Sequence, residues 1–327
     1  MNIYDIADLA GVSIATVSRV LNSGKVSEST KQKVLKIISE YQYVPSTYAR
    51  AMTMSSAKLV GIILTEIDDL YAANAVANFE SRLKQRGYDI IIFSTGKYIA
   101  DASNYINSLV SKKADAVILV GSKFESAEFA SILEPVSLEV PIIMLNSYVD
   151  RKGVYCVVSD DESAVSEIVD LLISREFRKL FYLYDSDSPS GTRKLEGFRR
   201  AASVFKDVEY QIVKCDKDIA TARRIVTGLV RDSRSRQAVI CSDDLLAVGA
   251  IKAAQDLKLS IPEDISVTGY DNSILSLSTT PELTTVDCML GELCSKSIDL
   301  MMDVLSGKTI KRKHVLKCKL IERKSTR

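Results

Sequence analysis

Apolar residues near the N-terminus recur at the spacing of amphipathic helices. One side of a first helix is apolar, and Gly11 supplies the turn that follows it. Ser13 stands at the N-cap position of a second helix, IATVSRVL, and Ser27 stands at that of a third. The apolar positions of the third helix are Val34, Ile37, Ile38 and Tyr41. Residues 3–41 are therefore predicted to form three short helices, within an N-terminal domain of residues 1–45.

The pattern changes after Pro45. The segment STYARAMTMSSA is small, polar and weakly helical, and it has no periodicity that would build a core. This composition is typical of a linker. Residues 46–58 are accordingly predicted to connect the N-terminal helices to the rest of the chain.

From Leu59 onward, short apolar runs alternate with amphipathic helices. Such runs are buried on both faces, which is typical of parallel sheets covered by crossover helices. The runs are LVGIIL, YDIIIFS, ADAVILV, PIIMLN, YCVVS, KLFYLY, YQIVKC, AVICS and ISVTGY. They are too many for one comfortable sheet, so we predict an α/β core of two doubly wound lobes. The first would hold about 59–157 and 289–327, and the second about 158–288.

Composition sets wide bounds on function. The chain has 327 residues, of which 46% are hydrophobic, enough to bury more than one core. Its 43 basic and 42 acidic residues exclude a polycationic protein. Residues 1–58 carry seven basic and four acidic side chains, a local surplus of three. Charge alone therefore does not identify a partner.

Cysteine usage and the N-terminus predict a location. The six cysteines form no C-x-x-C pair and mostly sit in apolar runs, where a thiol packs as a small hydrophobe. This usage favours the reducing cytoplasm. The start MNIYDIADLA lacks the features of a signal peptide, and no apolar stretch approaches membrane-spanning length. A soluble cytoplasmic protein without a membrane partner is expected.

Candidate chemistry for catalysis is sparse. The single histidine, His314, lies in the alternating run HVLKCKLI, which predicts one late strand. Histidine-based triads and histidine-containing metal sites would all have to use it. A half-exposed strand histidine is the favoured interpretation. The sequence also lacks a phosphate loop and a G-x-S-x-G elbow. No enzyme activity, metal or cofactor is predicted.

The second predicted helix is a candidate for contact with DNA. Helix, glycine turn and helix within about twenty residues is the layout of a helix-turn-helix, whose second helix enters the major groove. Its small polar side chains can donate to phosphates, its apolar ones suit thymine methyl groups, and its one arginine can pair with phosphate or guanine. The first group is Ser13, Thr16 and Ser18, the second is Ile14 and Ala15, and the arginine is Arg19. An ordinary three-helix cap is the alternative.

Several motifs carry a family resemblance. The runs IYDIADLAGVSIATVSRVLN and STKQKVLKIISEYQYVPSTYARAM, with IPEDISVTGYDN and TPELTTVD far downstream, resemble the lactose-repressor/galactose-repressor (LacI/GalR) family of bacterial transcription regulators. The resemblance covers essentially the whole chain. It implies a homodimer whose headpiece binds a palindromic operator in double-stranded DNA. It also implies a hinge that becomes helical on DNA and a two-lobed effector core resembling periplasmic sugar-binding proteins.

The resemblance extends the DNA-binding set into the linker. Asn22 closes the recognition segment, and Ala49 and Arg50 precede the position where the family usually has a leucine. Paired hinge helices wedge that leucine into a minor-groove base step. Here the residue is Met52, an unbranched and more flexible side chain that can still intercalate. A methionine on an exposed linker is the alternative.

The resemblance also places an effector site at the ends of parallel strands, as expected for open α/β sheets. Asn146, Asp243 and Asp271 stand at such ends, where their oxygens can accept hydrogen bonds from sugar hydroxyls. A strand-end cap or turn residue is the alternative for each one taken alone.

Two departures from the family pattern concern ligand charge. Lys194, with Arg193 beside it, precedes Gly197 where many relatives have an arginine, and Lys217 stands where some have an aromatic residue. Losing an apolar stacking face while keeping cations favours an anionic ligand such as a phosphorylated sugar. Solvated surface lysines, or carboxylates that pair with them and leave a neutral site, are the alternatives.

A transcription regulator, expected to act as a repressor, is therefore the predicted function, with a sugar or sugar phosphate as small-molecule effector. A catabolite-control type of regulator with a protein co-regulator is an alternative that the ending ERKST favours, but NSILSLSTTP lacks the basic residues of that branch. A sugar-binding transport protein would need a signal peptide and no headpiece. A homodimer is expected rather than a tetramer, because no leucine heptads follow the last strand.

Overall fold

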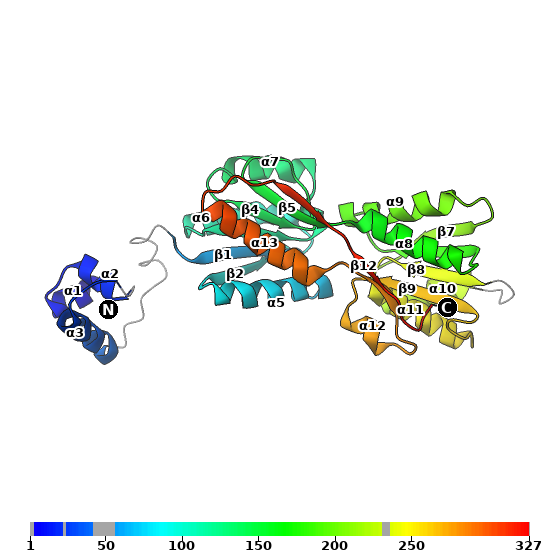
Figure 1. The fold of residues 1–327 in the computed structure, drawn as a ribbon, viewed down its shortest axis with the longest axis horizontal. Coiled ribbons are helices and arrows are strands. Elements are labelled where there is room, and N and C mark those ends of the chain that lie inside the picture. Colours follow the sequence, from blue (N-terminus) through cyan, green and yellow to red (C-terminus); the bar gives the residue numbers. More distant parts are fainter. Residues whose placement is uncertain (1–2, 22–23, 42–55, 231–235, 327) are drawn as a thin grey trace.

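The computed structural model describes residues 3–21, 24–41, 56–230 and 236–326 (Figure 1). Four predicted DNA contacts, Asn22, Ala49, Arg50 and Met52, lie outside these residues. Most of the predicted linker, 46–55, does so as well. Within the described part of the chain, no helix is both long enough and apolar enough to cross a membrane.

Three helices form the N-terminal unit, as the periodicity predicts. They are α1 (Ile3–Ala10), α2 (Ile14–Leu21) and α3 (Glu28–Glu40). Ser27 caps α3 by accepting a hydrogen bond from the Thr30 backbone N–H, and the Thr16 N–H donates to Ser13 Oγ at 3.2 Å. The small core between the helices consists of Ile6, Ala7, Ala10, Val17, Val20 and Val34.

The first lobe is a six-stranded parallel sheet in the order β11-β5-β4-β3-β1-β2. Its strands are β1 (Leu59–Leu64), β2 (Asp89–Ser94), β3 (Ala116–Val120), β4 (Ile142–Leu145), β5 (Val154–Ser159) and β11 (Lys313–Leu316). Its helices are α5 (Leu70–Gln85), α6 (Ala102–Ser111), α7 (Ala127–Val136) and α13 (Leu290–Leu305). Apolar side chains cover both faces of the sheet, α6 and α7 on one and α5 and α13 on the other.

The second lobe repeats this architecture in the order β12-β10-β9-β8-β6-β7. Its strands are β6 (Lys179–Tyr184), β7 (Glu209–Lys214), β8 (Gln237–Cys241), β9 (Ile265–Tyr270), β10 (Thr284–Asp287) and β12 (Lys319–Ile321). Its helices are α8 (Asp161–Ser174), α9 (Pro189–Ser203), α10 (Ile219–Leu229), α11 (Asp244–Asp256) and α12 (Ile274–Ser278). All pairings are parallel except that of β12 with β10.

The end of the chain departs from the prediction. The run HVLKCKLI is two strands, β11 and β12, and they belong to different sheets. The assignment of all of 289–327 to the first lobe is therefore wrong beyond β11. Both segments are half-exposed edge strands, so polar and apolar residues alternate in each. The alternation continues through the residues where the chain crosses to the other lobe, and the two strands therefore resemble one in the sequence. Strand β10 was also not predicted, since TTVD is too short and polar to stand out.

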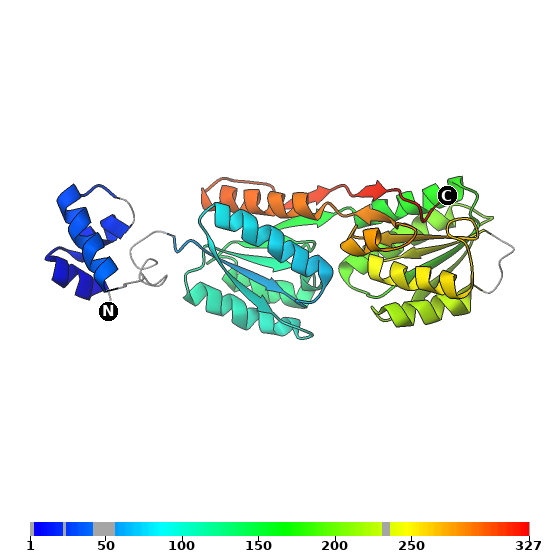
Figure 2. The same cartoon turned by 90° about the horizontal axis from the view of Figure 1, so that it is seen from below.

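The chain passes between the lobes after β5, after β10 and between β11 and β12 (Figures 1 and 2). In each sheet these strands lie at or next to one edge, the β11 edge of the first sheet and the β12 edge of the second. The crossings therefore gather on one side of the molecule. Strands β2 and β7 form the opposite edges, away from the crossings.

Candidate functional site

Helix α2 has one buried side and one exposed side. Val17 and Val20 pack into the core of the N-terminal unit. Ala15 and Arg19, four residues apart, are exposed, and Ile14, Thr16 and Ser18 are half-buried. Ser13 Oγ and Thr16 Oγ1 lie 2.9 Å apart at the start of the helix. The exposed side of α2 therefore carries the small and basic side chains that were predicted to contact DNA.

A cleft of about 800 Å³ lies between the two lobes. The strand-end residues Asn146, Asp243 and Asp271 line it, together with Lys194 and Lys217. These are five of the six residues predicted from the sequence. The carboxyl ends of parallel strands converge on one edge of each sheet, and the two lobes turn these edges toward each other.

Arg193 does not line this cleft, contrary to the prediction. Its guanidinium faces another hollow, where it pairs with Glu125 at 3.1 Å and with the buried Asp161 at 3.4 Å. Neighbouring residues on a helix point about 100° apart, so Arg193 and Lys194 of α9 cannot both face the cleft. The pair with Glu125 connects the second lobe to the first.

Asp271 combines burial with backbone strain. It has a φ of 93°, a conformation that is uncommon for a residue other than glycine and that tends to occur at functional sites. Burial raises the pKa of its carboxyl group to about 7, although Lys194 and Lys217 oppose the shift. Among the described residues, none forms a hydrogen bond or ion pair with this carboxylate. Its oxygens are therefore available to a bound ligand.

Lys194 is held by the protein rather than being solvated. Its Nζ donates to the Ser242 carbonyl oxygen at 2.9 Å and lies 3.6 Å from the centre of the Tyr270 ring. Burial alone would lower the pKa of this amine, but the surrounding carboxylates, with Asp271 foremost, raise it. The ammonium ion is thus already stabilised by a carbonyl, an aromatic face and nearby negative charge.

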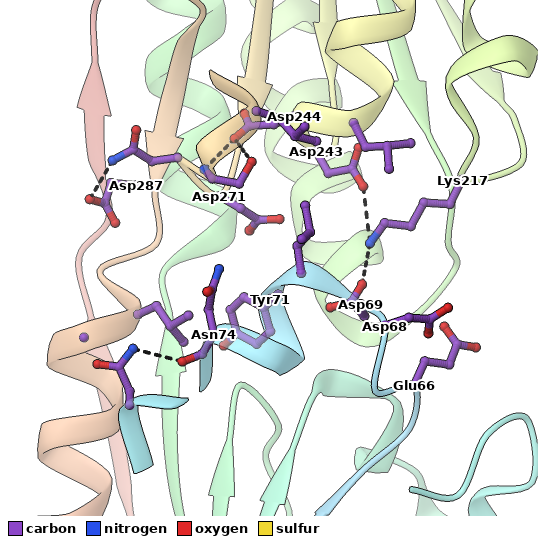
Figure 3. A pocket seen from close by; sticks show the side chains of 18 residues that line it. Glu66, Asp68, Asp69, Tyr71, Asn74, Lys217, Asp243, Asp244, Asp271 and Asp287 are labelled. Carbon is purple, nitrogen blue, oxygen red and sulfur yellow. Dashed lines mark hydrogen bonds and ion pairs between the residues drawn. The ribbon is translucent and has the colours of Figure 1, made fainter. Parts of the chain in front are cut away.

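Lys217 lies between two carboxylates from different lobes (Figure 3). Its Nζ is 2.7 Å from Asp69 Oδ2 of the first lobe and 3.3 Å from Asp243 Oδ2 of the second. Burial opposes charging of the amine, but the two carboxylates raise its pKa well above the usual value. Lys217 is therefore fully charged and ion-paired at neutral pH.

The charges of the cleft do not favour an anion. Six carboxylates line it against four lysines. Lys217 is already paired, and Lys123 lies 3.5 Å from Glu66. The prediction of an anionic ligand from Lys194 and Lys217 loses its basis here, because neither lysine lacks a partner. The alternative of a lysine paired with nearby carboxylates fits Lys217, whereas Lys194 contacts the Ser242 carbonyl and the Tyr270 ring.

Asn146 lines the cleft and is held by a hydrogen-bond network behind it. Its Oδ1 accepts a hydrogen bond of 2.9 Å from Ser159 Oγ. Ser159 Oγ also lies 2.6 Å from Oδ1 of the 1% exposed Asp161, which accepts hydrogen bonds from Ser190 Oγ and from the Tyr270 hydroxyl. This chain of hydrogen bonds runs from the first lobe into the second where β5 leads into α8. It fixes the orientation of Asn146.

A second cavity of about 490 Å³ adjoins the cleft (Figure 3). The two share Glu66, Asp69, Tyr71, Lys217, Asp243 and Asp271. Sequence reasoning missed Asp69 and Tyr71, which come from the loop after β1 and the start of α5. The Tyr71 hydroxyl is buried and has no hydrogen-bond partner within the described residues. The available signal for Asp69 was its place in the acidic loop that follows the strand LVGIIL, five residues after Leu64.

Comparison with known proteins decides the family. A model of bacterial regulatory proteins of the lacI family matches residues 2–46, and a periplasmic binding protein-like domain matches 169–326. An HTH-type transcriptional regulator of Lachnoclostridium phytofermentans is 38% identical and covers 100% of this chain and 99% of its own length. The chain belongs to the LacI family. The resemblance seen in its motifs is confirmed.

Other members of the LacI family give the same picture. The ribose operon repressor of Halalkalibacterium halodurans is 27% identical over 99% of this chain and 97% of its own length. The lac repressor dimer bound to operator and the anti-inducer ONPF shares the fold, with a TM-score of 0.88 and 22% identity over 100% of this chain and 99% of that one. These comparisons confirm the predicted fold class of a helix-turn-helix headpiece and two α/β lobes. This LacI-family chain is a DNA-binding transcriptional regulator.

Proposed function

We propose that this regulator represses transcription by binding a palindromic operator as a homodimer, under the control of a small uncharged ligand between the lobes. One observation carries this proposal. The same chain contains a helix-turn-helix and an interlobe cleft in which the Asp271 carboxylate has no partner among the described residues. Ligand and DNA sites on separate units are what allosteric control requires. Bacterial DNA lies in the cytoplasm, where the protein is expected to act.

We infer that α2 reads the major groove. Ala15 and Arg19 are exposed, and Ser13, Ile14, Thr16 and Ser18 complete the surface near the helix start. Base edges would be contacted by Ile14, Ala15 and Arg19, and phosphates by the hydroxyl groups. Asn22 and the linker residues Ala49, Arg50 and Met52 remain proposed contacts from the family resemblance.

Exposed apolar side chains support the homodimer. Ile67 of the first lobe is 62% exposed, and Ile274 and Leu277 of α12 are 66% and 53% exposed. Ile274 and Leu277 lie three residues apart on α12, so one partner surface could cover both. A second copy, related by a two-fold axis, would cover them and would match a palindromic operator.

Charge favours a sugar over a sugar phosphate as the ligand. The carboxylates of the cleft can accept hydrogen bonds from hydroxyl groups, while a phosphate would meet a surplus of negative charge. Two similar proteins have names that agree: the ribose operon repressor, and the regulator CelR in complex with cellobiose, which has a TM-score of 0.71 and 23% identity over 99% of both chains. The effector of this chain is inferred to be a neutral polyhydroxylated molecule.

A protein co-regulator, the catabolite-control alternative, stays a prediction that rests on the ending ERKST. Sugar transport and enzyme activity are set aside, because the relatives that match the whole chain are transcriptional regulators.

A thermal-shift screen of sugars identifies the ligand, since a ligand at a hundred times its Kd adds about 2.7 kcal/mol to stability. Calorimetric titration then compares that sugar with its phosphate ester in wild type, Asp271→Asn and the control Asp207→Asn. Asp207 is an exposed acid of the second lobe that pairs with Arg178.

We expect the neutral sugar to bind more tightly than the ester, and Asp271→Asn to weaken its binding by about 1.5–3 kcal/mol, the size of a charged hydrogen bond. Tighter binding of the ester would refute the neutral ligand. Equal affinities in Asp271→Asn and Asp207→Asn would remove Asp271 from the site.

A further inference from the structure

Lys217 joins the helix caps of opposite lobes. Asp69 is the N-cap of α5 in the first lobe, and its Oδ1 accepts from the Ala72 N–H at 3.0 Å. Asp243 is the N-cap of α11 in the second lobe, and its Oδ1 accepts from the Leu246 N–H at 2.8 Å. Each carboxylate thus uses one oxygen to cap its helix and turns the other toward Lys217.

This contact lies far from the segments that cross between the lobes. Lys217 follows β7, the edge strand of the second sheet that lies farthest from the interlobe crossings. The crossings act as the axis about which such lobes open and close. An ion pair on the side away from that axis must break when the lobes separate there.

The pair is partly protected from water. The Asp243 side chain is 8% exposed and that of Asp69 is 22% exposed, while the Lys217 side chain is 42% exposed. Both caps are anchored by backbone hydrogen bonds, so little side-chain freedom is lost when Lys217 binds them. Close, partly desolvated and pre-oriented charges attract more strongly than an exposed surface pair.

We propose that Lys217 is a latch, which favours the closed arrangement of the lobes through its ion pair with Asp69 and does so independently of any ligand. The proposal concerns the equilibrium between open and closed lobes, so it does not depend on the identity of the effector or on DNA binding. The Arg193–Glu125 pair, 3.1 Å long, is a second tie between the lobes near a different hollow. Loss of Lys217 alone should therefore loosen the lobes rather than separate them.

Cys288 provides a native reporter of opening. It lines the cleft at a crossing between the lobes and is only 2% exposed. A thiol reagent reaches it when the lobes part. Cys241 is a suitable internal reference, because it is buried in strand β8 inside the second lobe and reacts only when that lobe unfolds.

The experiment measures pulse alkylation by N-ethylmaleimide at each cysteine, by peptide mass spectrometry on the full-length protein without ligand. The variants are Lys217→Met and Asp69→Asn. Asparagine can still cap α5, so the second variant removes only the charge. The control is Lys214→Met, which removes an ion pair with Asp187 that lies entirely within the second lobe.

We expect Cys288 to react about two- to fivefold faster in Lys217→Met and in Asp69→Asn, the range for a partly exposed ion pair. Cys241 and the Lys214→Met control should match wild type. The two variants change local charge in opposite directions, so a shared acceleration cannot come from the acidity of the thiol.

Two results would overturn the latch. One is an unchanged rate at Cys288 in both variants. The other is equal acceleration at Cys288 and Cys241, which would mean that the ion pair supports folding of the lobes and not their closure. Neither result would bear on the proposed operator or effector, because neither molecule is present in the assay.

Discussion

Asp271 shows what a single position contributes to this regulator. It ends a buried strand, it has a left-handed backbone, and burial raises the pKa of its carboxyl group to about 7. A group held near neutrality in this way loses charge easily and can exchange hydrogen bonds with a ligand. The cost of burying its charge should be measurable without any ligand.

The first prediction concerns the pH dependence of stability. An unfolded Asp with its usual pKa is ionised throughout pH 6 to 8, while folded Asp271, with a pKa of about 7, releases its proton in this window. The folded state therefore binds more protons, and the free energy of unfolding falls as pH rises. This group should lower the stability of wild type by about 1.4 kcal/mol between pH 6 and 8 relative to Asp271→Asn.

Urea unfolding of both proteins at pH 6 and pH 8 checks this value. The buried Asp244, whose pKa is about 6, is present in both proteins. Parallel pH dependence in the two proteins would contradict titration of folded Asp271 between pH 6 and 8.

Residue chemistry was partly predictable. Asn146, Asp243 and Asp271 were found because strand ends converge in parallel sheets, a rule that needs no coordinates. Asp69 and Tyr71 were missed, since nothing in their local sequence places the start of α5 against the other lobe. The prediction that Arg193 lines the cleft was wrong, because the direction of this side chain depends on how α9 packs.

At the scale of elements, α2 is the headpiece helix whose exposed side was predicted most fully from the sequence. Its apolar positions Val17 and Val20 fix which side is buried, and this leaves Arg19 exposed. Helix periodicity therefore predicted both the element and its outward face.

Arg19→Ala is predicted to weaken specific operator binding by about 1–3 kcal/mol, because an arginine that pairs with a base edge contributes this much. Gel-shift titration measures the affinity, with Lys36→Ala on the exposed side of α3 as the control. Unchanged affinity in Arg19→Ala would exclude the side chain from the interface.

The C-terminal segment is the element that sequence reasoning handled least well. After β12 the chain stays in the second lobe, where the fully buried Ser325 donates to the Val267 carbonyl at 2.6 Å and accepts from the Thr284 N–H at 2.8 Å. These contacts are long-range, so no local pattern could reveal them.

Ser325→Ala should lower the free energy of unfolding by about 1–3 kcal/mol, since it leaves a buried donor and a buried acceptor without partners. Urea unfolding provides the value. Ser306→Ala, at an exposed serine whose hydroxyl donates to the Asp303 carbonyl, should change stability far less. Similar losses in both variants would contradict the structural role of Ser325.

At the scale of the whole molecule, the two-lobe architecture and the headpiece were predictable from periodicity and family motifs. The charge of the ligand could not be predicted in this way. The sequence contains Lys194 and Lys217, but only the three-dimensional arrangement shows that a carbonyl and an aromatic ring hold the first and that two carboxylates hold the second. Whether a charge is available to a ligand depends on contacts between segments far apart in the chain.

Control of DNA binding by the cleft requires a coupling between two sites. A ligand that prefers one lobe arrangement changes operator affinity by its differential binding free energy, typically 1–3 kcal/mol or about 5- to 150-fold. The variant Asp271→Asn should interrupt this coupling and leave the headpiece intact.

The most direct test is a fluorescence-anisotropy titration of a DNA duplex that the protein has selected from a random pool, with and without the sugar found by thermal shift. The selected site should be palindromic, and saturating sugar should change its Kd at least about fivefold in wild type. In Asp271→Asn the Kd without sugar should equal that of wild type, and the same sugar concentration should leave it unchanged. A wild-type Kd that does not change when the cleft is saturated with sugar would contradict effector control of DNA binding.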